Sequence, residues 1–160
     1  MVLRMFSGRL VGIYTASEAA KPLEPSTSVR AIEGVGLEGD RYATEVGTYS
    51  ERKGPHRQVT FVEREVVALV NDEAGIELGE HESRRNLVTE GVPLHHLIGH
   101  TFRVGDVLFR GIKSCPPCAH LERLTRPGVR AALENRGGLR AEIVQGGVLR
   151  IGDEITAVPG

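Results

Sequence analysis

Two short segments of the chain share one pattern, and this pattern constrains the fold more than any other feature. Each has an apolar run, then Gly-Asp, then a second run, and they read FRVGDV at 102–107 and LRIGDE at 149–154. Glycine readily adopts the positive φ that tight turns between antiparallel strands require, so each segment predicts a β-hairpin. Two copies are too few for a solenoid. We therefore expect a mainly β, barrel-like fold built from hairpins.

The rest of the chain fits one domain spanning residues 1–160, since a chain of this length is too short for two ordinary domains. Apolar residues at three- and four-residue steps after 58–61 predict a helix, and Thr60 and Glu63 have the spacing of a capping box. Short helices are expected at 93–98, 119–124 and 129–133. The remaining strands are expected at 8–15, 27–32, 83–89, 108–112, 139–144 and 155–158.

Composition excludes several classes of protein. The formal net charge of -1 argues against a general binder of nucleic acid or of anionic membranes, because such binders carry an excess of Lys and Arg. No stretch approaches the ~20 apolar residues of a membrane-spanning helix, and the N-terminus lacks the pattern of a signal peptide. Two cysteines do not form a secreted disulfide framework. We therefore expect a cytoplasmic protein.

The segment GVGLEG at 34–39 formally matches the glycine pattern of dinucleotide-binding sites. That site needs a helix directly after the glycines, so that the helix N-terminus faces the pyrophosphate. The sequence that follows, DRYATEVGTYSERKG, has no helical apolar period. A glycine-rich turn that brings the backbone close to a neighbouring segment is the better interpretation.

The segment CPPC at 115–118 follows a predicted strand and precedes a predicted helix. A dithiol redox pair, a single reactive or metal-ligating thiolate, and two packed cysteines beside a proline turn all fit this context. A zinc site is a further alternative, although no His-x₃-His follows the cysteine segment at the spacing of a zinc finger. Its additional ligands would come from His95, His96, His100 or His120. The residues alone leave these alternatives open.

Arginine occurs beside glycines or polar side chains in several predicted turns, where guanidinium groups suit the recognition of phosphate or carboxylate. Taken singly, each such residue is more often solvated surface charge. Together they could converge on an anion. The segments concerned are Asp40-Arg41, His56-Arg57, Ser83-Arg84-Arg85-Asn86 and Arg136-Gly137-Gly138-Leu139-Arg140.

Five segments in this order resemble the MOSC domain, the C-terminal module of molybdenum-cofactor sulfurases, and above all its small stand-alone bacterial members. They cover most of the chain, and the combined signal is more specific than any one of them. The segments are GVGLEGDRY at 34–42, HRQVTFVE at 56–63, SRRNLVTEGVPLHHLIGHTFRVGDVLFRG at 83–111, CPPCAHLE at 115–122 and RGGLRAEIVQGGVLRIGD at 136–153.

The resemblance implies a MOSC β-barrel that binds a pyranopterin molybdenum cofactor. It points to Cys118 as the catalytic residue and the ligand of the metal, because the family's cysteine precedes a segment like AHLE. A soft thiolate suits such a metal, and a helix N-terminus would keep the thiol deprotonated. The cofactor's phosphate and pterin need cationic and amide donors. The residues expected to bind it are Arg41, His56, Arg85, Asn86 and Arg140.

Some relatives, such as the amidoxime-reducing component, reduce N-hydroxylated compounds, and the resemblance implies the same activity for this chain. Two cysteines cannot hold a four-cysteine iron–sulfur cluster, so such a reductase needs external electron-donor proteins as partners besides its small-molecule substrate. A sulfur or cofactor carrier with a persulfide on Cys118 is the first alternative. A dithiol redox protein that uses Cys115 and Cys118 is the second.

Overall fold

The strands dominate the described part of the chain. The structure is a computed structural model and describes residues 6–18, 20–44, 57–75, 77–116, 128, 131 and 136–159. Two short 3₁₀ helices, Glu80–Ser83 and Leu94–Leu97, precede the strands that begin at Leu87 and Thr101. The other elements are β1 (Gly8–Thr15), β2 (Glu24–Ser26), β3 (Ser28–Ile32), β4 (Gly36–Leu37), α1 (Arg41–Thr44), β5 (Val59–Glu63), α2 (Arg64–Ala74), β6 (Leu87–Glu90), β7 (Thr101–Val104), β8 (Val107–Ser114), β9 (Leu139–Gln145), β10 (Gly147–Arg150) and β11 (Glu154–Ala157).

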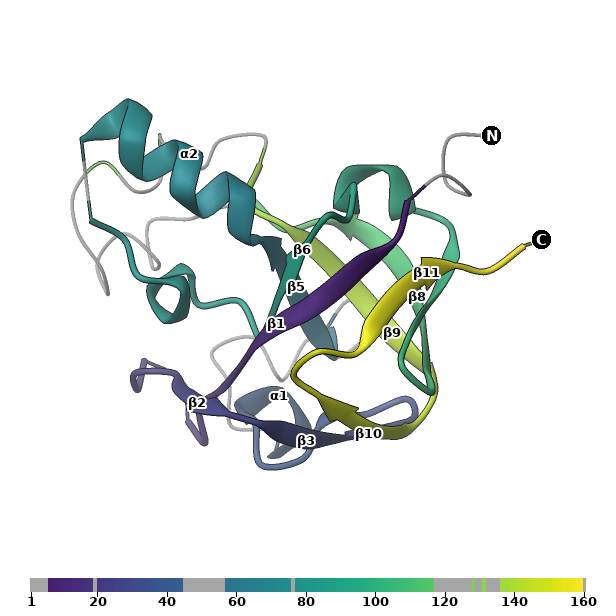
Figure 1. Cartoon of the computed structure of the whole chain (residues 1–160). Coiled ribbons are helices and arrows are strands. Elements are labelled where there is room, and N and C mark those ends of the chain that lie inside the picture. The colour runs from purple at the N-terminus through teal and green to yellow at the C-terminus, as the bar shows by residue number, and fades with distance from the viewer. Residues whose placement is uncertain are drawn as a thin grey trace.

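Seven strands close into a barrel in the order β11-β7-β8-β9-β5-β6-β1, and β1 pairs back onto β11 (Figure 1). All these neighbours are antiparallel except β5 and β6, which are parallel. A parallel pair needs a crossover connection, and α2 supplies it by crossing the outside of the barrel. The prediction of a mainly β barrel with few helices is confirmed.

Alternate residues of the strands fill the barrel, as the two-residue period of a strand requires. Three aromatic rings, Phe61, Phe102 and Phe109, pack at its centre with centroids 5.1–5.6 Å apart. None of the three rings is exposed to solvent. The packing of these rings from β5, β7 and β8 connects opposite sides of the closed sheet, so the barrel interior is a solid core.

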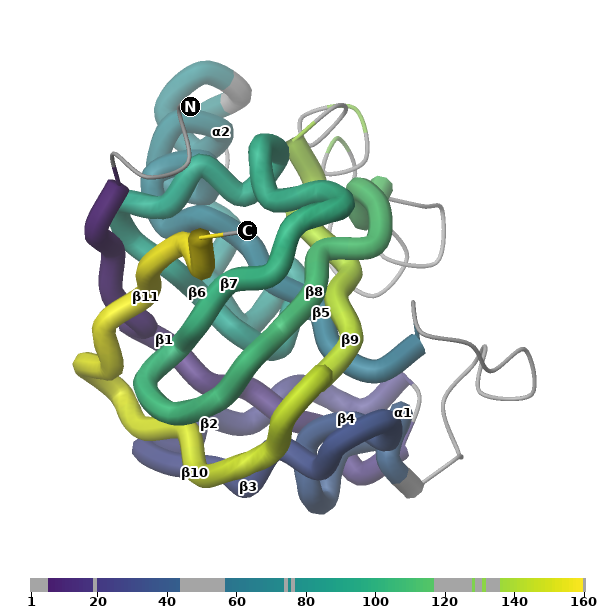
Figure 2. Tube along the Cα trace, turned by 90° about the vertical axis from the view of Figure 1, so that its right-hand side faces the viewer, coloured from purple at the N-terminus to yellow at the C-terminus, as the bar shows by residue number. Residues whose placement is uncertain are grey.

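A second sheet of three strands, β10-β3-β4, covers one end of the barrel (Figure 2). The glycine-rich segment at 34–39 contains the turn after β3, the short strand β4 and the turn before α1, and a Cβ at Gly36 would lie 2.9 Å from the carbonyl oxygen of Gln58. The prediction of a turn that brings the backbone close to a neighbouring segment is therefore confirmed. The polar stretch after it, 45–56, lies outside the described residues.

The two Gly-Asp segments fold differently, although their sequences are alike. The first joins β7 to β8 as a hairpin, as predicted. The second was predicted to be a hairpin as well, and this prediction is wrong, because β10 pairs with β3 while β11 pairs with β7 and β1. The turn here is a corner between two sheets, and the Asp153 carboxylate stabilises it by accepting a 2.8 Å hydrogen bond from the Arg150 N–H.

Helix α2 begins one residue after Glu63, and the predicted capping box is wrong. Glu63 is the N-cap residue and makes no capping hydrogen bond with its side chain, while Thr60 lies within β5. The helix ends at Gly75, whose φ of 65° is the left-handed conformation usual at this position. Val67 and Val70 face the barrel and are buried.

The other predicted strands agree with the structure to within a few residues, apart from the start of 83–89. Arg84 has a φ of 62°, and the strand begins only at Leu87. The short helix expected at 93–98 is the 3₁₀ helix Leu94–Leu97. The helices expected at 119–124 and 129–133 fall largely outside the described residues. Within the described ranges, no helix has the length and apolar character needed to cross a membrane.

Candidate functional site

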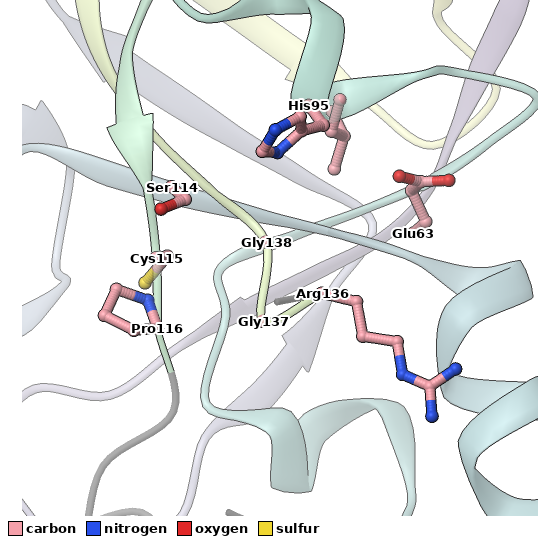
Figure 3. Close-up of a pocket in the computed structure, with 9 residues that line it drawn as sticks. Glu63, His95, Ser114, Cys115, Pro116, Arg136, Gly137 and Gly138 are labelled. Atoms are coloured by element: carbon pink, nitrogen blue, oxygen red, sulfur yellow. The ribbon is translucent and has the colours of Figure 1, made fainter. Parts of the chain in front are cut away.

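A pocket of about 130 Å³ opens where β8 ends and β9 begins (Figure 3). Ser114, Cys115 and Pro116 lie on one side of the view in Figure 3, and the carboxyl group of Glu63 lies on the other. The residues that line the pocket are Glu63, Leu94, His95, Ser114, Cys115, Pro116, Arg136, Gly137 and Gly138. The chain continues from Pro116 into residues 117–127, which lie outside the described part, so the predicted metal ligand Cys118 does too.

Cys115 is the one of the two cysteines that the structure describes. Cys115 is 1% exposed and lines the pocket. It directly follows Ser114, the last residue of β8. The backbone N–H of Cys115 donates a 2.8 Å hydrogen bond to the carbonyl of Gly138, which extends the β8–β9 pairing by one step. The sequence feature that we singled out therefore does lie at a pocket.

Arg85, predicted to bind the cofactor, lies beneath this pocket and is 7% exposed. Its Nε donates to the carbonyl of Gly137 at 2.7 Å, and its Nη2 donates to the carbonyls of Cys115 and Pro116 at 3.1 and 3.3 Å. The guanidinium thus contacts the backbone of three residues that line the pocket.

Asn86, also predicted to bind the cofactor, is completely buried between three strands. Its Oδ1 accepts hydrogen bonds from the N–H and the hydroxyl of Thr60, at 3.1 and 3.2 Å, and its Nδ2 donates to the Tyr14 carbonyl at 3.1 Å. These bonds connect β1, β5 and the start of β6. The cofactor-binding role of Asn86 stays a prediction, and a ligand would have to compete with these bonds.

Arg41 belongs to a buried cluster with Asp40 beside the turn before β6. Asp40 is fully buried and Arg41 is 6% exposed, and they form a 3.2 Å ion pair. Arg41 also donates to the Arg84 carbonyl at 3.3 Å and lies over the Tyr42 ring, with 4.6 Å between the guanidinium carbon and the ring centroid. The structure thus places Arg41 at the backbone of Arg84, which is adjacent in the chain to Arg85, another predicted residue.

Arg84 was not among the predicted ligands, yet its position is unusual. It is 9% exposed, and Nη1 donates to the Lys21 carbonyl. Burial and the nearby charge of Arg41 lower the pKa of Arg84 to about 10. Among the described residues, the guanidiniums of Arg41 and Arg84 are therefore buried near one carboxylate, Asp40, and guanidinium groups suit the recognition of an anion. The Arg-Arg pair in the sequence indicated such a site without showing which arginine would serve it.

Arg140 and His56 are the remaining predicted ligands. Arg140 lies on β9 between the buried residues Leu139 and Ala141, so alternation directs its side chain to the outer face of the barrel. It does not line the pocket. His56 lies outside the described residues.

Glu63, Arg136 and His95 complete the polar lining of the pocket, although Glu63 was expected from its sequence position only to cap a helix. Burial raises the pKa of Glu63, the nearby charge of Glu65 raises it further, and a hydrogen bond from the Leu94 backbone opposes both. The charge of Arg136 is directed to α2, where its Nη2 lies 3.0 Å from Glu73 Oε1.

The described residues contain no group of three metal-ligating side chains, so the zinc alternative gains no support from them.

Comparison with known proteins identifies the fold and the family. The family model of the MOSC domain matches residues 48–156. The YuaD protein from Bacillus subtilis is 17% identical with a TM-score of 0.77, and the match covers 94% of this chain and 97% of that one. YiiM from Geobacillus stearothermophilus is 14% identical with a TM-score of 0.74, over 95% and 75% of the two chains. YiiM from Escherichia coli is 20% identical with a TM-score of 0.64, over 98% and 71%. No curated protein matches.

Proposed function

The chain belongs to the MOSC domain family, and from this premise we propose that it binds a pyranopterin molybdenum cofactor at the Cys115 pocket and reduces N-hydroxylated bases. MOSC domains are commonly associated with this cofactor. The observation that carries the proposal is the adjacency of two kinds of site. Arg85 donates a hydrogen bond to the backbone of Cys115, which lines the pocket. Arg84, the residue before Arg85 in the chain, accepts a hydrogen bond from the buried Arg41.

The described residues fit the two ends of such a cofactor. Its phosphate end is anionic, and the buried guanidiniums of Arg41 and Arg84 are donors of the kind that bind phosphate. Its metal end accepts soft ligands, and the cysteine segment borders the pocket. The pocket of about 130 Å³ is smaller than the ~300–1,000 Å³ of typical ligand sites, so the described residues would hold only part of the group.

The cofactor would supply the two electrons of the reduction when bound, and the chain's residues would supply binding and protons. Reduction of an N-hydroxylated base consumes two electrons and two protons, breaks the N–O bond and releases water. Glu63 is the carboxyl group in the lining of the pocket, and burial, which raises its pKa, favours the protonated form that a proton donor needs. Arg84 would bind the phosphate end through its guanidinium. External electron-donor proteins would complete the cycle.

A direct test is to produce the protein in a host that makes the cofactor. Metal analysis and fluorescence of the oxidised pterin measure binding, and turnover of an N-hydroxylated purine with a reduced viologen measures the reaction. Stoichiometric molybdenum together with turnover supports the proposal. Molybdenum without turnover leaves a carrier, and a persulfide on Cys118 would then identify the sulfur-carrier alternative. No molybdenum, together with a reversible disulfide between Cys115 and Cys118, would favour the dithiol alternative.

A further inference from the structure

The guanidinium of Arg85 joins the two backbone segments that form one side of the pocket. Its three hydrogen bonds, 2.7–3.3 Å long, run to the carbonyls of Gly137, Cys115 and Pro116. Gly137 precedes β9, while Cys115 and Pro116 follow β8. All three carbonyls belong to residues that line the pocket.

The bonds lie where the regular pairing of the two strands stops. The β8–β9 ladder ends at the pair Ser114 and Leu139, and the Cys115 N–H to Gly138 carbonyl bond follows it. Beyond this point the two segments continue as pocket walls, and Arg85 is bonded to both of them. The separation of the walls is therefore set by a side chain that is 30 residues from Cys115 and 52 residues from Gly137 in the sequence.

The same bonds restrict what else Arg85 can do. A guanidinium binds phosphate in a bidentate manner through two neighbouring N–H groups. In Arg85 the neighbouring Nε and Nη2 groups already donate to backbone carbonyls. The side chain is 7% exposed, and releasing it would leave three carbonyls without their donor.

We propose that Arg85 is a positioning residue, which holds the Cys115–Pro116 segment against Gly137 and so sets the width of the pocket and the burial of the Cys115 thiol. Its role is not to bind the cofactor's phosphate. A lysine cannot replace it, because an ammonium group is a point donor and lacks the planar fork that bridges two separate segments.

The apo protein tests this proposal through the thiol itself. In a Cys118→Ser background Cys115 is the one thiol left in the chain, and its rate of reaction with an aromatic disulfide reagent reports how often the pocket wall opens. We expect Arg85→Ala to react at least about tenfold faster than the parent. A loss of about 1.4 kcal/mol in the free energy that keeps the wall closed raises the population of the open wall tenfold. Arg85→Lys should react about as fast as Arg85→Ala, and added methylguanidinium should slow Arg85→Ala but not Arg85→Lys.

A matched control separates local opening from general destabilisation. Val70→Ala removes methyl groups of a fully buried α2 residue outside the pocket lining, so it lowers global stability without touching the wall. The proposal is overturned if Val70→Ala, compared at equal free energy of unfolding, accelerates the reaction as much as Arg85→Ala. It is also overturned if Arg85→Ala reacts no faster than the parent, or if inorganic phosphate slows the reaction of the parent but not that of Arg85→Ala. Because no cofactor is present in the assay, failure of the proposed function leaves this test intact.

Discussion

Thr60 and Asn86 are joined by three hydrogen bonds across the parallel pair of strands. The Asn86 side-chain oxygen accepts from the Thr60 N–H and hydroxyl, and the Asn86 N–H donates to the Thr60 hydroxyl oxygen at 3.0 Å. Both residues are at most 1% exposed. β5 and β6 are the parallel neighbours in the barrel. This polar contact therefore holds the start of β6 beside β5.

Asn86→Ala should therefore lower the free energy of unfolding by about 2–4 kcal/mol, because it removes the side-chain hydrogen bonds to the buried Thr60 N–H and to the Tyr14 carbonyl. Urea unfolding followed by circular dichroism measures the change. Thr60→Val removes the hydroxyl but keeps the shape. A double-mutant cycle with Asn86→Ala should show coupling of about 0.5–3 kcal/mol. Additive effects of the two substitutions would contradict a direct link between them.

Arg84 occupies a left-handed backbone conformation, with φ at 62°, that glycine adopts without strain. We therefore expect Arg84→Gly to be more stable than Arg84→Ala by about 1 kcal/mol, measured by urea unfolding. Both variants should bind the molybdenum cofactor more weakly, by roughly 10- to 150-fold if one charge-assisted contact is lost. An exposed arginine on β7, Arg103, provides the control substitution to alanine. Unchanged cofactor affinity in both Arg84 variants would remove this residue from the site.

The pKa of Arg84 adds a pH dependence to this binding. Because that pKa is lowered to about 10, the cationic form that attracts an anion is lost as the pH rises through this value. Cofactor affinity should be constant near neutral pH and fall as the pH rises through about 10. Isothermal titration at several pH values measures it, and Arg84→Gln should lose the alkaline decrease. An alkaline decrease of equal size in Arg84→Gln would assign the pH effect to another group.

Glu63 should make the protein less stable as the pH rises from acidic to neutral values. Its pKa is raised in the folded state, chiefly by burial, so the folded state binds more protons than the unfolded state between the two pKa values. The free energy of unfolding therefore falls with pH across that window. Glu63→Gln should remove this decrease and gain stability relative to the parent at pH 7.5 but not at pH 4. Asp72→Asn, at an exposed carboxyl on α2, is the control for a general charge effect. Equal pH profiles for the parent and Glu63→Gln would contradict the assignment.

The two cysteines should differ in function. If Cys118 ligates the metal, Cys118→Ser should abolish viologen-driven turnover and remove one sulfur scatterer from the molybdenum X-ray absorption spectrum. Cys115 lines the pocket but is 1% exposed and bonded into the end of the β8–β9 pairing. Cys115→Ser, a nearly isosteric change, should keep a substantial part of both signals. A dithiol mechanism would instead make the two losses equal, because one thiol attacks and the other resolves the mixed disulfide.

Much of the barrel could be predicted from local sequence. β1 lies at the predicted residues 8–15, and the first Gly-Asp turn joins two strands as expected. These elements depend on the alternation of side chains and on the φ of glycine, both of which act over a few residues. The second Gly-Asp segment has the same local pattern, yet its strands belong to different sheets. Which strand a neighbour pairs with depends on the closure of the whole barrel, and no local pattern specifies it.

The sequence by itself determined the family, the predominance of strands and the cysteine segment as the place to look for chemistry. Only the tertiary structure separated the roles of the three consecutive residues Arg84, Arg85 and Asn86. Their composition predicts an anion site, because guanidinium and amide groups are donors wherever they lie. What each donor binds is decided by groups far away in the chain. Thr60 and Tyr14 take the amide of Asn86, and the carbonyls of Gly137 and Cys115 take Arg85. A buried polar group must be satisfied by whatever the fold brings next to it, and residues so distant in sequence become neighbours only when the barrel closes.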